Sequence, residues 1–212
     1  MPRRRFRGRD SYARRAPSRE PYDAVLIVCE GTKTEKYYFD GLKAAHRLSS
    51  ANIEIAPLGK DPLSVVTHAI SELERDDTLT RAYCVFDRDG HATYGDAIRK
   101  AGDHKLGKNG RLKLAVSVPC FEVWPLLHFR YTTQPIEGAG NHSPGDRTLS
   151  LVQQEMPDYS KCDRAIFEKL SPKLKDALQR AKKLATHNAK SASDNPATEV
   201  HCLVQYLIGL KR

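Results

Sequence analysis

Blocks of apolar residues with two different spacings follow one another along the chain. The segment from Ala24 to Cys29 contains only aliphatic residues and one cysteine, which predicts a strand buried on both faces, as in a parallel sheet. Further apolar stretches predict strands at 52–57, 82–87 and 112–118. Helical spacing between them predicts helices over about 33–47, 62–73 and 92–102. This alternation favours an α/β fold with a parallel, doubly wound sheet flanked by helices.

The second half of the chain is predicted to be mainly helical. A short helix should begin near Cys120, and Pro125 should kink or displace it unless the proline falls in the first turn. The Gly, Pro, Asn and Thr content of 131–147 indicates a long irregular loop. Helices follow over about 162–170, 172–190 and 196–210. We therefore expect an α/β domain over 21–131 and a loop with a helical C-terminal extension over 132–212.

The first 20 residues differ in composition from the rest. They hold eight arginines against Asp10 and Glu20, so they carry +6 of the formal charge of +9, and the other residues carry only +3. With almost no apolar side chains, the segment 1–20 is predicted to be a disordered basic arm. Such an arm could follow nucleic-acid phosphates, or it could order only on a partner.

The cysteines and the hydropathy narrow the class of protein. Five cysteines lie far apart without a C-x-x-C pair, which argues against a zinc site or a disulfide framework and for a reducing compartment. No apolar run approaches the length of a bilayer, and the Arg-rich start lacks an apolar h-region. We expect a soluble, cytoplasmic protein that does not bind a membrane.

Carboxylates stand where two of the predicted strands end. Glu30 follows the first strand, and Asp87 and Asp89 follow the third, each motif leading into a glycine. Ligands of open α/β sheets bind beyond the carboxyl ends of the strands. Carboxylates two residues apart in extended backbone face one side and can share a divalent cation. We predict that Glu30, Asp87 and Asp89 hold Mg²⁺ or Mn²⁺.

Three further residues are candidates for the same site, and each also has a purely structural explanation. Lys33 could stabilise a phosphate or developing charge beside the metal, or it could face solvent in a first helical turn. Glu35 fits a capping box with Thr32 better than a ligand role. Glu122 is a third acidic candidate at a strand exit, or a first-turn glutamate that complements the helix dipole.

Two tyrosines and a lysine-rich group also have plain structural explanations. Tyr37 and Tyr38 could be nucleophiles as in a topoisomerase, yet aromatic residues at helical spacing are usually core. A basic group could be a nucleic-acid face, although a solvated helix surface is the default; it comprises Lys173, Lys175, Arg180, Lys182 and Lys183.

The acidic motifs together resemble a known domain. A hydrophobic strand ending in Glu-Gly, followed by a later one ending in Asp-x-Asp-Gly, is similar to the Toprim domain of primases, topoisomerases and OLD-type nucleases. Four segments are similar to the RloB-like family, namely PYDAVLIVCEGTKTEKYYFDGL, VFDRDGH, PCFEVWPLLHF and NPATEVHCLV. They cover much of 21–131 and the last helix, and Pro125 departs from the aliphatic residue expected there. The resemblance implies a Toprim-like fold and an association with bacterial antiphage loci, often beside an ATPase partner.

Residues and resemblance together favour a metal-dependent endonuclease, a hydrolase of DNA or RNA that acts in antiphage defence of the abortive-infection kind. Its catalytic residues would be Glu30, Lys33, Asp87, Asp89 and Glu122. A catalytically silent Toprim-like docking module of an ATPase and a nucleotidyl transferase of the primase type are the alternatives. A P-loop ATPase is disfavoured because G-T-K-T lacks the spacing needed to cradle phosphates. We expect a homodimer or an ATPase partner to use the helical third, with its apolar face on 197–210 and basic face on 173–183.

Overall fold

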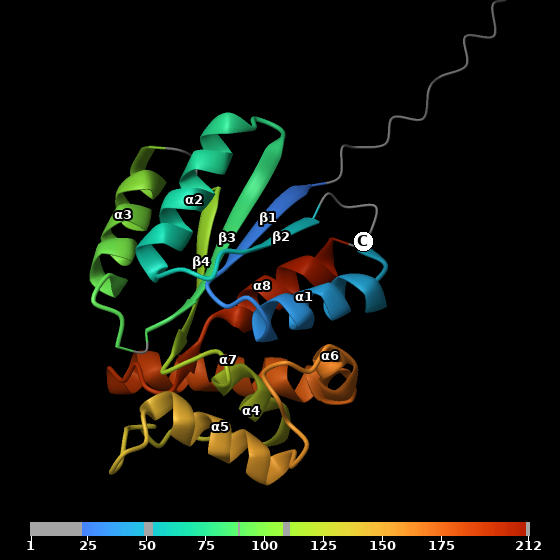
Figure 1. Cartoon of the computed structure of the whole chain (residues 1–212), viewed down its shortest axis with the longest axis vertical. Coiled ribbons are helices and arrows are strands. Elements are labelled where there is room, and N and C mark those ends of the chain that lie inside the picture. The colour runs from blue at the N-terminus through green and yellow to red at the C-terminus, as the bar shows by residue number, and fades with distance from the viewer. Residues whose placement is uncertain (1–22, 49–52, 89, 108–110, 211–212) are drawn as a thin grey trace, which may run out of the picture.

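The computed structural model describes residues 23–48, 53–88, 90–107 and 111–210, so the predicted arm and Asp89 lie outside the described residues. Five strands form one sheet in the order β2-β1-β3-β4-β5, and Figure 1 shows β1 to β4 of this sheet. Four are parallel, namely β1 (Ala24–Cys29), β2 (Ile53–Pro57), β3 (Leu79–Asp87) and β4 (Leu112–Val118). The short β5 (Ala197–Thr198) pairs antiparallel with the end of β4.

Helices cover both faces of this sheet, as the buried run of β1 requires. One hydrophobic cluster joins Val25 and Ile27 of β1 to α1 (Thr34–Ala45) and α8 (Val200–Gly209). The other joins Leu26 and Val28 to α2 (Pro62–Arg75) and α3 (Tyr94–Gly107). Successive side chains of β1 thus point into opposite layers, and every residue of the strand is buried. The predicted α/β fold with a mostly parallel sheet is confirmed.

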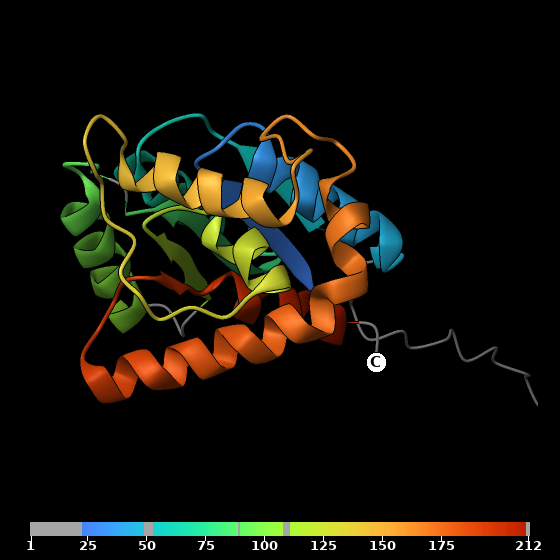
Figure 2. The ribbon, with the colours of Figure 1, turned by 90° about the horizontal axis from the view of Figure 1, so that it is seen from below.

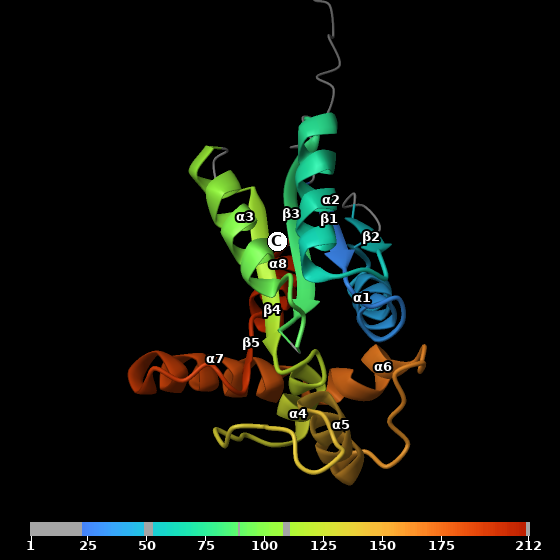
Figure 3. The same cartoon turned by 60° about the vertical axis from the view of Figure 1, so that its left-hand side comes forward.

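The remaining helices lie beyond the carboxyl ends of the strands (Figure 3). They are α4 (Val123–Phe129), α5 (Pro144–Glu155), α6 (Ile166–Leu170) and α7 (Leu174–Ser191), with the 3₁₀ turn η2 (Ser171–Lys173) between the last two. Figure 2, seen from below, shows α5 and the long α7 spread across this end of the molecule. Pro125 falls in the first turn of α4, where its missing N–H breaks no helical hydrogen bond, so the helix forms without a break.

Two elements were missed in the predicted loop and helical third. The loop expected over 131–147 ends early, because Pro144 already begins α5. Ser143 and Asp146 form a reciprocal capping box there, a start signal that the high Gly and Pro content obscured. The segment expected to begin a helix at Pro196 first pairs as β5 with β4, and α8 starts only at Val200.

The apolar face of α8 belongs to the core, which corrects the expected docking surface. Val200, Leu203, Val204 and Leu207 are all fully buried, and the same cluster contains Phe39 of α1. This face is therefore not available to a second copy or to a partner protein. Among the described residues, no helix is long and apolar enough to cross a membrane.

Candidate active site

The strand order reverses between β1 and β3, and both strands end in a carboxylate there. Chain connections lead from β1 outward to β2 on one side and from β3 outward to β4 on the other. Such a switch point leaves a crevice at the carboxyl ends of the two central strands. The backbone N–H of Glu30 donates to the carbonyl of Val85 at 2.9 Å, and the N–H of Asp87 donates to Oε2 of Glu30 at 3.1 Å. The sheet therefore brings these two predicted site residues together.

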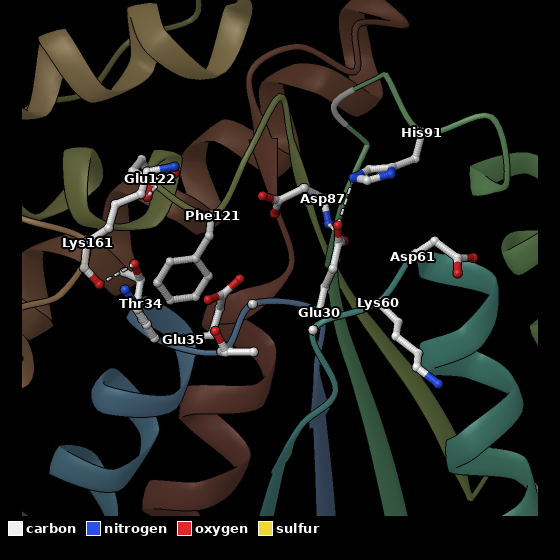
Figure 4. Close-up of a pocket in the computed structure, with 14 residues that line it drawn as sticks. Glu30, Thr34, Glu35, Lys60, Asp61, Asp87, His91, Phe121, Glu122 and Lys161 are labelled. Atoms are coloured by element: carbon white, nitrogen blue, oxygen red, sulfur yellow. Dashed lines mark hydrogen bonds and ion pairs between the residues drawn. The ribbon is translucent and has the colours of Figure 1, made fainter.

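An open pocket of about 470 Å³ occupies this crevice (Figure 4). Its acidic side chains come from four different segments, and the carboxylates of Glu30, Asp87 and Glu35 point toward its centre. The turn after β2 and the loop after α5 complete the wall. The lining residues are Glu30, Gly31, Thr32, Lys33, Thr34, Glu35, Gly59, Lys60, Asp61, Asp87, His91, Phe121, Glu122 and Lys161.

Glu30 is held from two sides. Besides the N–H of Asp87, Nε2 of His91 lies 2.7 Å from Oε1 of Glu30. Burial raises the pKa of Glu30, while these two neighbours act to lower it. Both carboxylate oxygens of Glu30 are thereby oriented in the pocket wall. His91 was not among the predicted site residues, although its place directly after the Asp-x-Asp-Gly motif was a signal.

Asp87 and Glu35 are desolvated carboxylates that face other carboxylates. Burial raises the pKa of Asp87 well above its usual range, and the carboxylates of Glu35 and Glu122 raise it further. Burial also raises the pKa of Glu35, to about 7, with a smaller contribution from Glu122. Gly31 makes room for this arrangement, because a Cβ at that position would collide with the Glu35 carboxylate. Several carboxylates thus lie close together at a place where burial already disfavours their charged form.

The capping-box interpretation of Glu35 is wrong. Helix α1 begins at Thr34, its N-cap is Lys33, and no side chain caps it. The Thr-x-x-Glu spacing therefore lies one residue out of register with the helix start. Glu35 is only 7% exposed and borders the pocket, so it joins the acidic group that the sequence placed at the strand ends.

Glu122 lies at the N-cap of α4 and pairs with a lysine from the C-terminal extension. Nζ of Lys161 is 3.3 Å from Oε1 of Glu122, and the hydroxyl of Tyr159 donates to the same oxygen at 3.4 Å. Burial acts to lower the pKa of Lys161, but Glu122, Cys120 and Asp87 together outweigh this effect, and the pKa is raised. Lys161 therefore brings a protonated amine into the acidic pocket. No local pattern around Lys161 in the sequence pointed to this role.

The two remaining predicted site residues are Lys33 and Asp89. Lys33 borders the pocket, and its Nζ donates to Sγ of Cys162 at 3.4 Å. Asp89 lies outside the described residues and remains a prediction. Asp61, the N-cap of α2, also lines the pocket. Hydrogen bonds from Ser64 and Thr93 lower the pKa of Asp61 to about 2, so it is a fixed negative charge on the rim.

The donor chemistry of the pocket suits a hard divalent cation. All its acidic ligands are carboxylate oxygens, which Mg²⁺ and Mn²⁺ prefer over the nitrogen and sulfur ligands of zinc sites. Among the described residues, no three His, Cys, Asp or Glu side chains are already gathered as a metal site. Glu30 and Asp87 are nonetheless adjacent, and the buried, mutually repelling carboxylates around them are the environment that a cation would neutralise.

Comparison with known proteins finds a matching family model. The model of a family described as RloB-like protein matches residues 25–207, from the start of β1 into α8. The match includes every described residue of the pocket wall. Searches of curated proteins and of solved structures each found no significant match.

Proposed function

The chain belongs to the RloB-like protein family, and from this premise we propose that the acidic pocket is the active site of a metal-dependent endonuclease that hydrolyses phosphodiester bonds of DNA or RNA. One observation carries the proposal. Asp87 and Glu35 lie at the switch point of the sheet, where burial raises the pKa of each carboxyl group and the other carboxylates that face it raise it further. Clustered, desolvated carboxylates reduce stability and are typical of sites that bind cations.

The residues divide into metal-binding and charge-stabilising groups. Glu30, Asp87 and Asp89 would hold Mg²⁺ or Mn²⁺, with His91 fixing the orientation of Glu30. A bound divalent ion would polarise the scissile phosphate and lower the pKa of the attacking water. Glu35 lines the same wall and adds a carboxylate to the set.

Lys161 is the better placed of the two lysines for the phosphoryl oxygens. Its ion pair with the buried Glu122 keeps the amine charged and directs it to the pocket. The amine of Lys33 is engaged by Cys162 at the edge of the same wall. We therefore assign charge stabilisation in the transition state to Lys161 first, with Lys33 as a second cation, and we give Glu122 the role of positioning Lys161.

The biological setting is part of the proposal and rests on the family resemblance. The nuclease would be an effector of bacterial antiphage defence and would work with an ATPase partner. The main alternative, a catalytically silent docking module, would not need desolvated carboxylates facing a pocket, because a docking surface gains nothing from burying like charges.

Cleavage by the purified full-length chain tests the proposal. Supercoiled plasmid DNA and tRNA are incubated with Mg²⁺, Mn²⁺ or EDTA, and products are resolved on gels. We expect divalent-dependent cleavage of one substrate, lost in Asp87→Asn and retained in Asp77→Asn. Asp77 is a matched control, because it is exposed and precedes the amino end of β3, at the opposite edge of the sheet. Absence of cleavage of both substrates by the wild type favours the docking module.

A further inference from the structure

A second pocket lies beside the acidic one, where α1 meets the loop that precedes α6. Its volume is about 560 Å³, and Thr32 borders both pockets. Two cationic side chains and one aromatic ring dominate its wall. The lining residues are Thr32, Lys36, Tyr37, Asp40, Gly41, Pro57 and Arg164. A chain that passes through the acidic pocket could therefore continue into this one without leaving the surface.

The ring and the guanidinium in this pocket face each other. The guanidinium carbon of Arg164 lies 5.7 Å from the centre of the Tyr37 ring. Tyr37 is partly exposed, whereas its neighbour Tyr38 is fully buried among the rings of the core. Arg164 is exposed and has no ion-pair partner among the described residues. Of the two tyrosines noticed in the sequence, Tyr38 belongs to the core, and Tyr37 lies partly exposed beneath the guanidinium of Arg164.

The loop over 156–165 holds this arrangement against α1. The hydroxyl of Thr34 donates to the carbonyl of Lys161 at 2.9 Å, which fixes the loop at the first turn of the helix. Oδ1 of Asp163 accepts the N–H of Ala165 at 2.8 Å, so the backbone around Arg164 is itself turned by a local hydrogen bond. The same loop thus supplies Lys161 to the acidic pocket and Arg164 to its neighbour.

We propose that the second pocket binds a nucleobase of a single-stranded nucleic acid, one that flanks the phosphate held in the acidic pocket. The inference rests on the proposed function, because it assigns a substrate contact to the same site. Every base has a π-face that stacks on tyrosine, and an arginine plane can stack on a base as well. Lys36 also lines this pocket, but Asp40 on the rim compensates its charge, so Arg164 supplies the positive charge for the backbone of the bound strand. The second pocket adjoins the acidic pocket, and binding of a protein ligand would not require the two pockets to be joined.

Binding of abasic oligonucleotides by the full-length chain tests the subsite. All proteins carry Asp87→Asn so that no cleavage occurs, and affinity for fluorescent single-stranded oligonucleotides is measured by anisotropy. One abasic nucleotide is moved along the strand. At one position we expect affinity to fall on the order of tenfold or more, the effect of losing a stacked base. Adding Tyr37→Ala should weaken binding of the intact strand by a similar factor and remove the dependence on that position, because both changes delete the same contact.

Matched variants separate stacking from general damage. Tyr37→Phe keeps the ring and should bind like the parent, and Arg164→Ala should lose part of the effect. Tyr131→Ala is the control, since this partly exposed ring also lies beneath a cation, Lys183 at 4.3 Å, but outside both pockets.

The outcomes distinguish the subsite from the proposed nuclease. Three results would each overturn the subsite. The effects of Tyr37→Ala and of the abasic nucleotide could be additive, Tyr37→Ala could have no effect on binding, or the parent protein could fail to bind. Wild-type cleavage combined with any of these leaves the nuclease standing. Conversely, a non-additive Tyr37 effect in a chain whose wild type cleaves no substrate supports the subsite and refutes the nuclease.

Discussion

Oε2 of Glu30 accepts a hydrogen bond from the backbone N–H of Asp87 at 3.1 Å, although the two residues are 57 positions apart in the sequence. The bond continues the pairing of β1 with β3, so the sheet itself holds the two carboxylates close together. Side chains positioned by strands are placed more accurately than side chains on loops, which is what a metal-binding pair requires. The two central strands of the sheet thus hold the proposed metal-binding pair in place.

Asp87→Asn should leave the metal-free protein as stable as the wild type, or more stable, because it removes a charge that burial and Glu35 disfavour. Wild-type protein at a Mn²⁺ concentration of about 100 times Kd should gain about 2.7 kcal/mol from binding. The variant should lose this gain together with cleavage. Thermal-shift curves with and without Mn²⁺ measure both effects. A variant that melts lower without metal and still responds to Mn²⁺ would show that Asp87 is structural.

The pH dependence of stability should report the desolvated Glu35. Its pKa is about 7 in the folded protein, against an ordinary value of 4.5, so the unfolded chain releases the proton first as pH rises. The metal-free unfolding free energy should therefore fall from pH 4.5 to 7, by up to about 3 kcal/mol, and level off above that. Glu35→Gln should flatten this slope in urea titrations, while Glu54→Gln, at an exposed site, should not. Equal slopes in all three proteins would contradict the assignment.

The strand ends could be predicted because local pattern determines them. An uninterrupted apolar run such as 24–29 specifies a strand buried on both faces, and the carboxylate that ends it must then lie at the edge of the sheet. Glu30 and Asp87 were found in this way. The sequence-based argument could not supply the strand order, which decides that these two strands are neighbours, but a parallel sheet places all such ends on one edge.

Residues whose roles depend on register or on distant contacts were misassigned or missed. Glu35 was taken for a cap because Thr32 stands three residues before it, yet the helix begins only at Thr34. Lys161 contacts Thr34 across 127 positions through a loop without regular structure. Hydrophobic periodicity carries no information on how such a loop crosses a helix, so the partner of Glu122 was not predictable.

Leu203→Asp should abolish folding, in contrast to the surface role first expected for this face. Leu203 is fully buried in the cluster shared by α8 and the sheet, and an unpaired carboxylate there costs more than about 4 kcal/mol. Cys202→Asp is the control, because Cys202 is exposed on the first turn of the same helix. Circular dichroism and soluble yield distinguish the two. A folded Leu203→Asp protein with altered oligomeric state would restore the docking interpretation.

Lys161→Ala should separate the two roles of this lysine, as partner of Glu122 and as cation of the pocket. Its removal leaves the buried Glu122 without its ion pair, which should reduce the unfolding free energy by about 1–3 kcal/mol and abolish cleavage. Adding Glu122→Gln should restore much of the stability, because a neutral amide needs no counter-charge, but it should not restore cleavage.

Lys175→Ala, on the exposed face of α7, controls for loss of a lysine. Urea unfolding and gel assays measure the two effects. Wild-type cleavage by Lys161→Ala would reduce the lysine to a structural partner, and Lys33 would then be the remaining candidate for stabilising the phosphoryl oxygens.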